Sequence, residues 1–317
     1  MSVKPIVKTD RAATGKVRAA LRRITKHRYL YLMLLPGAVF VLLFNYVPMY
    51  GAIISFKAYN PMLGIIDSSW VGLQHFQKLF SSSIFWRVLR NTVILSILNL
   101  AVGMPAPIIL ALLMNEVRSK GFRRVAQTIT YLPHFMSWIV LSSMVISLLS
   151  PYTGILARLA ALFGMTNDSF ILVMPEYFRG VLVGSSLWKE VGWGSIIYLA
   201  AIAGVDAELY DAAIIDGCTR FQRVWHITLP GIMPTIVVML ILRLGGMLNS
   251  NFEQIQTLYS PTVYSMGDVI STYVYREGIQ KLNYSYTTAI GLFQSVIGFT
   301  LVVLSNRFAR RVDQSLW

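Results

Sequence analysis

Cysteine is almost absent from this chain. Its 317 residues include a single cysteine, Cys218, which excludes an internal disulfide and a metal site built from several cysteines. The four histidines show no metal-binding spacing, and none of the patterns H-E-x-x-H, G-x-S-x-G and Walker A occurs. We therefore expect no catalytic residues, no metal, no cofactor and no ATP hydrolysis by this chain itself.

Charged residues are also scarce, and acidic residues are the scarcest. Charged residues make up 13% of the chain, about half of the roughly 25% found in soluble domains. Lysine and arginine number 28 against 14 aspartates and glutamates, which gives a net charge of +14. Such an excess can indicate a nucleic-acid partner. Here the basic residues border long apolar runs and do not alternate with aromatic residues, so we expect a membrane and no nucleic acid.

Apolar sequence is abundant. Hydrophobic residues make up 55% of the chain, and the mean hydropathy is +0.59. A helix needs about 20 apolar residues to cross a bilayer. Four uncharged runs are long enough: residues 29–56, 91–115, 125–157 and 282–306. Two further runs, residues 178–203 and 231–249, contain charged residues, so we predict an all-α polytopic membrane protein with six transmembrane helices.

The first of these runs could instead be the core of a cleaved signal peptide. Such a core has about 7–15 apolar residues and ends at small residues. Residues 29–56 form a longer run, contain Pro36 and Pro48, and are not followed by an A-x-A site. We therefore expect a retained first transmembrane helix.

Basic residues orient the helices through the positive-inside rule. Nine lysines and arginines precede the first helix, and others lie in the loops after the second and fourth helices and in the tail. Both termini are therefore expected in the cytoplasm of a multi-pass plasma-membrane protein. The expected segments are a basic cytoplasmic segment 1–28, a first transmembrane helix 29–56, an extracellular loop 57–90, a five-helix transmembrane domain 91–306 and a cytoplasmic tail 307–317.

The cytoplasmic loop at residues 205–230 is more than a turn between two helices. Asp206 is positioned to cap a short helix, and Gly217 can end that helix with left-handed backbone. Thr219 and Gln222 have the spacing of a capping box, which predicts the start of a second short helix. We expect a rigid helix–turn–helix on the cytoplasmic surface.

Small and aliphatic residues share the first of these short helices. Ala212 and Ala213 would let a partner surface approach closely, while Ile214 and Ile215 offer apolar area to bury. The loop reads Asp-Ala-Ala-x3-Gly-x9-Ile-x-Leu-Pro, which resembles the EAA motif of ABC importer permeases and departs from it only by Asp in place of Glu. The motif residues are Asp211, Ala212, Ala213, Gly217, Ile227, Leu229 and Pro230.

The resemblance extends along nearly the whole chain. Segments such as Leu35-Pro36-Gly37, Trp70-Val71-Gly72-Leu73 and Gly192-Trp193-Gly194 are similar to the polysaccharide, aldouronate and alginate-oligosaccharide branch of these permeases. The resemblance implies the type I, maltose-permease-like fold and one half of a path for an oligosaccharide or polysaccharide fragment. The implied partners are a second homologous permease subunit, two ATP-binding subunits docked at the EAA loop, an extracellular solute-binding lipoprotein and membrane lipid.

Charges inside membrane helices usually face protein or water, because each costs about 2.5–3.5 kcal/mol at mid-bilayer. We hypothesise that Arg243, the polar residues after it and two tryptophans line the sugar path. These residues are Arg243, Asn249, Asn251, Glu253, Gln254, Trp188 and Trp193. Alternatively, Arg243 pairs with an acidic residue to fix helix packing, and the tryptophans belong to the interfacial belt.

Three other polar residues lie within the predicted helices. Lys189 and Glu190 are adjacent and therefore lie on different helix faces, so we expect their partners on other helices. His134 is interpreted as a packing or hydrogen-bonding residue. The alternatives to the sugar importer are an ABC permease for another solute, an ion-coupled secondary transporter with inverted repeats and buried titratable relays, and an intramembrane enzyme with converging reactive groups.

Overall fold

The computed structural model describes residues 26–151, 154, 155, 158, 171–249 and 251–310. The predicted basic segment 1–28 and tail 307–317 lie mostly outside these residues, as does part of the end of the predicted third helix. The described part is mostly helical, as expected, and contains one two-stranded sheet.

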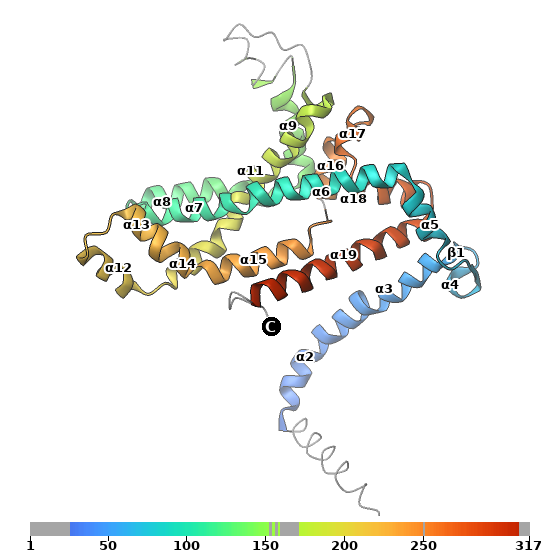
Figure 1. Cartoon of the computed structure of the whole chain (residues 1–317), viewed down its shortest axis with the longest axis horizontal. Helices are drawn as coiled ribbons and strands as arrows, with labels where there is room; N and C mark the ends of the chain where they lie inside the picture. Colours follow the sequence, from blue (N-terminus) through green and yellow to red (C-terminus); the bar gives the residue numbers. More distant parts are fainter. Residues whose placement is uncertain (1–25, 152–153, 156–157, 159–170, 250, 311–317) are drawn as a thin grey trace, which may run out of the picture.

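The first predicted span is helical throughout. It consists of α2 (Arg28–Val41), the π-helix η1 (Leu42–Tyr46), α3 (Val47–Met49) and the 3-10 helix η2 (Tyr50–Phe56), which together are long and apolar enough to cross a membrane. Pro48 has no N–H to donate to the preceding turn, which fits the widened helix at η1. Its side chains up to Tyr50 are exposed, and only η2 packs closely against α19 (Tyr284–Arg310) (Figure 1).

The predicted extracellular loop 57–90 contains regular structure. β1 (Lys57–Asn60) pairs antiparallel with β2 (Ser68–Trp70), with α4 (Gly64–Asp67) between them and α5 (Gln74–Ser81) after them. The second membrane helix begins at Ser83, earlier than the expected residue 91, because the Ser82 hydroxyl caps α6 (Ser83–Gly103). After a break at Met104 the helix continues as α7 (Pro105–Glu116).

The prediction of an unbroken third helix over residues 125–157 is wrong. α8 (Lys120–Tyr131) and the 3-10 helix η3 (Leu132–Phe135) meet α9 (Trp138–Leu149) at an angle of 106°. Pro133 cannot donate a helical hydrogen bond, and the Ser137 side chain caps the new helix by accepting from the Val140 N–H. The apolar composition of the run concealed this break.

The fourth predicted helix is one element, α11 (Pro175–Ala203), which follows the short 3-10 helix η4 (Ile171–Val173). It is 29 residues long, although its polar and charged residues keep it out of the set of helices that are apolar enough to span a membrane. By length and composition the described residues provide three such helices, or five if each bent pair forms one span. Together with α11 these account for the six expected helices.

The fifth span is also bent. α12 (Ala207–Ile215) and α13 (Arg220–Arg223) form the loop, and the chain continues through the π-helix η5 (Val224–Thr228) and α14 (Leu229–Gly231). α15 (Met233–Gly245) then departs at 57°. Short helices connect it to α19: α16 (Phe252–Leu258), η6 (Pro261–Val263), α17 (Tyr264–Gly267), α18 (Ile270–Val274) and the π-helix η7 (Tyr275–Gln280).

α11 lies at the centre of the packing. It contacts α6, α7, α8 and α17, while α15 packs against α19 (Figure 1). Glycine permits the closest of these contacts, since a Cβ on Gly192 would lie 2.0 Å from the Thr130 carbonyl oxygen. The largest buried cluster joins α6, α9, α11 and α16 through residues such as Leu95, Leu141, Phe178 and Ile255.

Candidate functional site

The loop formed by α12 and α13 has the predicted local hydrogen bonds. The Asp206 carboxylate accepts from the Glu208 N–H at 3.0 Å, and Gly217 has a φ of +74°. Thr219 and Gln222 form the reciprocal capping box that their spacing predicts. Each half of the loop is therefore fixed by contacts within a few residues.

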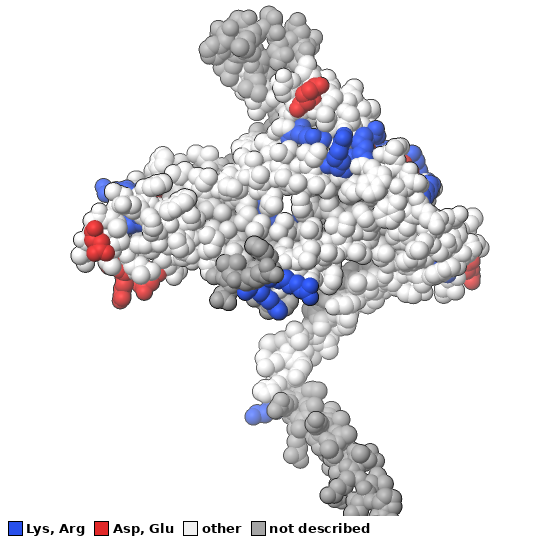
Figure 2. Space-filling view, viewed as in Figure 1, with Lys and Arg blue, Asp and Glu red and all other residues white. Residues whose placement is uncertain are grey.

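The loop exposes apolar and acidic side chains. Ile215 is 85% exposed, and Phe221 and Trp225 stack on each other at 6.3 Å while remaining exposed. Four carboxylates at the α12 end, Asp206, Glu208, Asp211 and Asp216, stand out against the largely uncharged middle of the molecule (Figure 2). The expectation that Ala213 presents its side chain to a partner is wrong, because Ala213 is buried and its carbonyl accepts from the Cys218 N–H.

The other motif residues connect this loop to the helices. Asp211, Ala212, Gly217 and Pro230 are exposed, and Ile227 and Leu229 are half-buried. Leu229 packs against the buried cluster around Ile202 and Ile232. A movement of the loop would therefore be transmitted through Leu229 into α11 and α15.

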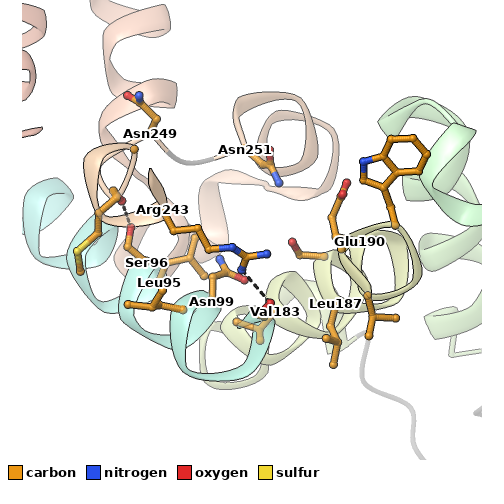
Figure 3. Close-up of a pocket in the computed structure, with 17 residues that line it drawn as sticks. Leu95, Ser96, Asn99, Val183, Leu187, Glu190, Arg243, Asn249 and Asn251 are labelled. Carbon is orange, nitrogen blue, oxygen red and sulfur yellow. Dashed lines mark hydrogen bonds between the residues drawn. The ribbon is translucent and has the colours of Figure 1, made fainter. Parts of the chain in front are cut away.

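An open cavity of about 440 Å³ lies between α6, α11 and α15. Arg243 extends into it and donates from Nη1 to the Gly103 carbonyl at 2.8 Å (Figure 3). In the described part of the chain Arg243 forms no ion pair, so the alternative of an acidic packing partner has no support there. Polar side chains share the wall: Ser96 and Asn99 on α6, Glu190 on α11, and Asn249 and Asn251 after α15.

Glu190 is held by a contact across helices. Its Oε2 lies 2.9 Å from Nδ1 of His134, and the His134 ring stacks on Trp193 with centroids 4.5 Å apart and planes at 1°. Trp193 and Glu190 both line the cavity. The expectation that His134 is a hydrogen-bonding residue is confirmed.

Lys189 points away from the cavity. It is buried and donates to the carbonyls of Pro133, His134 and Met136, where η3 ends. The expectation that Lys189 and Glu190 find partners on other helices is confirmed. Lys189 is thus a buried donor to the His134 and Met136 carbonyls at the sharp bend of the third span and a second donor to the Pro133 carbonyl, which also accepts from the Met136 N–H.

The structure brings four of the seven predicted path residues to the cavity: Arg243, Asn249, Asn251 and Trp193. Gln254 is buried, and its amide donates to the Leu182 carbonyl and the Ser185 hydroxyl at 2.7 and 2.9 Å. Glu253 and Trp188 are exposed and do not line the cavity. Sequence reasoning missed Ser96 and Asn99, whose three-residue spacing on a helix in an apolar run was the available signal.

A second polar cluster lies on the side of α17 and α18. Arg276 pairs with the fully buried Asp268 at 2.6 Å, and Asn91 joins this cluster to Arg179 on α11 through a 2.8 Å hydrogen bond. Burial lowers the pKa of Arg276, but the hydrogen bonds and charge of Asp268 outweigh it and leave the pKa raised. This ion pair connects η7 to the segment between α17 and α18.

Comparison with known proteins identifies the family of this chain. The family described as binding-protein-dependent transport system inner membrane component matches residues 103–316. The chain belongs to this family. The chain is 45% identical over 299 residues to the polygalacturonan/rhamnogalacturonan transport system permease protein YteP of Bacillus subtilis (strain 168). The match covers 94% of this chain and 93% of that one. The chain is 44% identical to the protein LplB of the same organism, covering 95% and 94%.

Solved structures agree with this membership. A bacterial ABC transporter involved in the import of the acidic polysaccharide alginate superposes with a TM-score of 0.86 at 44% identity, covering 93% of this chain and 99% of that chain. The bacterial alginate ABC transporter in complex with alginate pentasaccharide-bound periplasmic protein gives a TM-score of 0.85 at 43% identity, covering 93% and 98%. The predicted type I importer fold is confirmed, and the chain is a multi-pass permease subunit.

Proposed function

We propose that this permease subunit forms half of the translocation path of an ATP-driven importer for acidic oligosaccharides. The observation that carries the proposal is Arg243, an exposed guanidinium that extends into an open cavity and pairs with no described carboxylate. A guanidinium binds a carboxylate through two parallel hydrogen bonds, which suits the uronate units of an acidic sugar chain. Two relatives more than 40% identical to this chain are named for polygalacturonan/rhamnogalacturonan and for alginate, whereas relatives at 24–25% identity are named for sn-glycerol-3-phosphate.

The rest of the cavity suits the remaining surface of a sugar. Amide groups of Asn99, Asn249 and Asn251 offer donors and acceptors to hydroxyl groups. Trp193, already stacked on His134, offers an apolar edge to a pyranose ring. Glu190 can accept from hydroxyl groups while His134 fixes its position.

Coupling to ATP belongs to the loop of α12 and α13 in this proposal. The exposed Ile215, Phe221 and Trp225 would be buried in an ATP-binding subunit, and the caps keep the loop rigid enough to transmit force. ATP hydrolysis takes place on two such subunits, and a second homologous permease and an extracellular solute-binding lipoprotein complete the assembly. Both termini and this loop lie in the cytoplasm in this proposal, and the extracellular loop ends at Ser82, before α6.

The substrate proposal is tested in the reconstituted complex with its partner subunits. Uptake and ligand-dependent ATP hydrolysis are measured with acidic and neutral oligosaccharides of equal length. Arg243→Gln should lower uptake of acidic oligosaccharides about 10- to 100-fold, the effect of losing a charge-assisted hydrogen bond. The control Arg307→Gln changes an exposed arginine at the far end of α19 and should leave uptake unchanged. Equal uptake of neutral and acidic sugars that is insensitive to Arg243→Gln would refute the proposal.

The coupling proposal is tested by cross-linking. In a Cys218→Ser background, Ile215→Cys should form a covalent product with an ATP-hydrolysing subunit, because Ile215 is the most exposed aliphatic residue of α12. Leu304→Cys, an exposed position on α19, serves as the control and should not capture that subunit. A loop that is labelled only from outside the cell would overturn the assignment.

A further inference from the structure

A second cavity, of about 420 Å³, lies between α16, α18, η7 and α19. Ten residues line it, and none of them is charged. Its volume falls within the roughly 300–1,000 Å³ typical of small-molecule sites, as does that of the Arg243 cavity. The two cavities therefore differ in charge and not in size.

Aromatic rings form much of the wall of this second cavity. Phe252 on α16 and Tyr275 on η7 lie with ring centroids 5.1 Å apart, and Tyr284 at the start of α19 also lines the cavity. Aromatic faces pack well against the C–H face of a pyranose ring because both surfaces are apolar and flat. No charged residue lines this cavity, so no strongly hydrated group would have to lose its water when the sugar ring packs against the aromatic faces.

Two polar groups in this wall have no hydrogen-bond partner among the described residues. The Ser271 hydroxyl is buried without a partner, although buried polar groups are nearly always paired. The Asn249 side chain is exposed and makes no hydrogen bond within the described ranges. A ligand with hydroxyl groups would bond to the exposed amide of Asn249 while its apolar face covers Tyr275.

Asn249 connects this cavity to the first one. It lines both, and its side chain points away from Arg243 and Asn99 (Figure 3). The second cavity lies toward α5 and β1, the end of the molecule expected outside the cell (Figure 1). A sugar chain that enters from that end would meet the neutral cavity before the arginine.

The backbone around the cavity is specialised. η7 is a π-helix, a rare conformation that occurs frequently at functional sites. Gly278 lets it lie close to α19, because a Cβ there would be 2.9 Å from Oγ1 of Thr287. Gly278 and Thr287 both line the cavity, so this close approach forms part of its wall.

We propose that this second cavity is a neutral, aromatic-walled sugar subsite that holds one unit of the oligosaccharide while the next unit occupies the Arg243 cavity. The proposal rests on the proposed function, since it assigns a second unit of the same substrate. It predicts that the two cavities act on different parts of the chain and therefore respond differently to substrate length.

The test measures uptake of acidic oligosaccharides of increasing length by the reconstituted complex. Tyr275→Leu should lower uptake of the longer oligosaccharides about two- to tenfold, the range for one aromatic contact, and leave the shortest nearly unchanged. Arg243→Gln should lower uptake at every length. Phe299→Leu, which removes an exposed ring of α19 outside both cavities, should change nothing.

A second measurement does not depend on transport. In a Cys218→Ser background, Ile279→Cys, at an exposed position in the cavity wall, should react with a small neutral thiol reagent, and a long acidic oligosaccharide should slow the reaction. Three results would each overturn the subsite: a length-independent loss in Tyr275→Leu, no loss at any length, or cross-linking of Ile279→Cys to the second permease in the resting complex. The acidic preference and its loss in Arg243→Gln would survive all three results, so failure of the subsite is distinguishable from failure of the proposed function.

Discussion

The α12–α13 loop and the Arg243 cavity are held mainly by different means. In the loop, the caps join residues no more than a few positions apart, such as Thr219 to Gln222, and the Tyr210–Thr228 hydrogen bond and the Arg220–Glu116 ion pair add two longer contacts. In the cavity, Arg243 bonds to Gly103 and Glu190 to His134, so both charged side chains are positioned by distant parts of the chain. The loop should therefore keep its shape when the helices move, while the cavity should change shape with them. That difference suits a loop that transmits force as a rigid unit and a translocation path that changes shape.

Lys189→Met should have the largest effect, and it tests the contacts between distant helices. The change leaves three carbonyls at the bend of the third span without their buried donor, which should destabilise the fold by about 2–3 kcal/mol. Thermal unfolding in detergent measures the loss, and Lys281→Met, an exposed lysine, is the matched control. Equal unfolding temperatures for both variants would contradict the role of Lys189 at the bend.

Gly217→Val should break the loop without damaging the cavity. A β-branched residue at φ +74° is strained by about 1–2 kcal/mol, so the turn between α12 and α13 should open. We expect normal membrane insertion and a loss of transport-coupled ATP hydrolysis. Gly217→Asn is the control, because asparagine tolerates left-handed backbone, and it should retain most activity. Full coupling in the valine variant would show that the turn geometry is dispensable.

The sequence predicted the loop better than the cavity, because the loop depends more on contacts between neighbouring residues. The caps at Asp206 and Thr219 and the left-handed Gly217 were predictable because each depends on neighbours in the chain. The buried Ala213 was not, because the burial of one small side chain depends on the tertiary arrangement around it and not on its neighbours in the chain.

The cavity was only partly predictable. Arg243 and Asn249 stood out as polar residues near an apolar run, yet Gln254 has the same character and is used for packing against α11. Only the tertiary arrangement separates these roles. The 106° bend of the third span had local signals in Pro133 and Ser137, but the lysine that stabilises it comes from another helix.

Asn99→Ala sharpens the comparison within the cavity. Asn99 lines the wall beside Arg243 but carries no charge, so its loss should lower uptake about fivefold, the value of one neutral hydrogen bond. Uptake assays at several substrate concentrations measure the change. Asn283→Ala, outside this cavity, is the control. A loss as large as that of Arg243→Gln would mean that Asn99 supports the fold and not the substrate.

Thr219→Ala should have the smallest effect and tests whether the loop is locally encoded. Removing the capping hydroxyl costs about 1 kcal/mol of local stability, since the N–H of Gln222 loses its acceptor. Hydrogen exchange should quicken at residues 220–223 and stay unchanged at α6 and α11 around the cavity. Thr219→Ser restores a capping hydroxyl and should exchange like the parent protein. If exchange also quickened around Arg243, loop and cavity would form one cooperative unit, and the rigid loop could not move independently of the path.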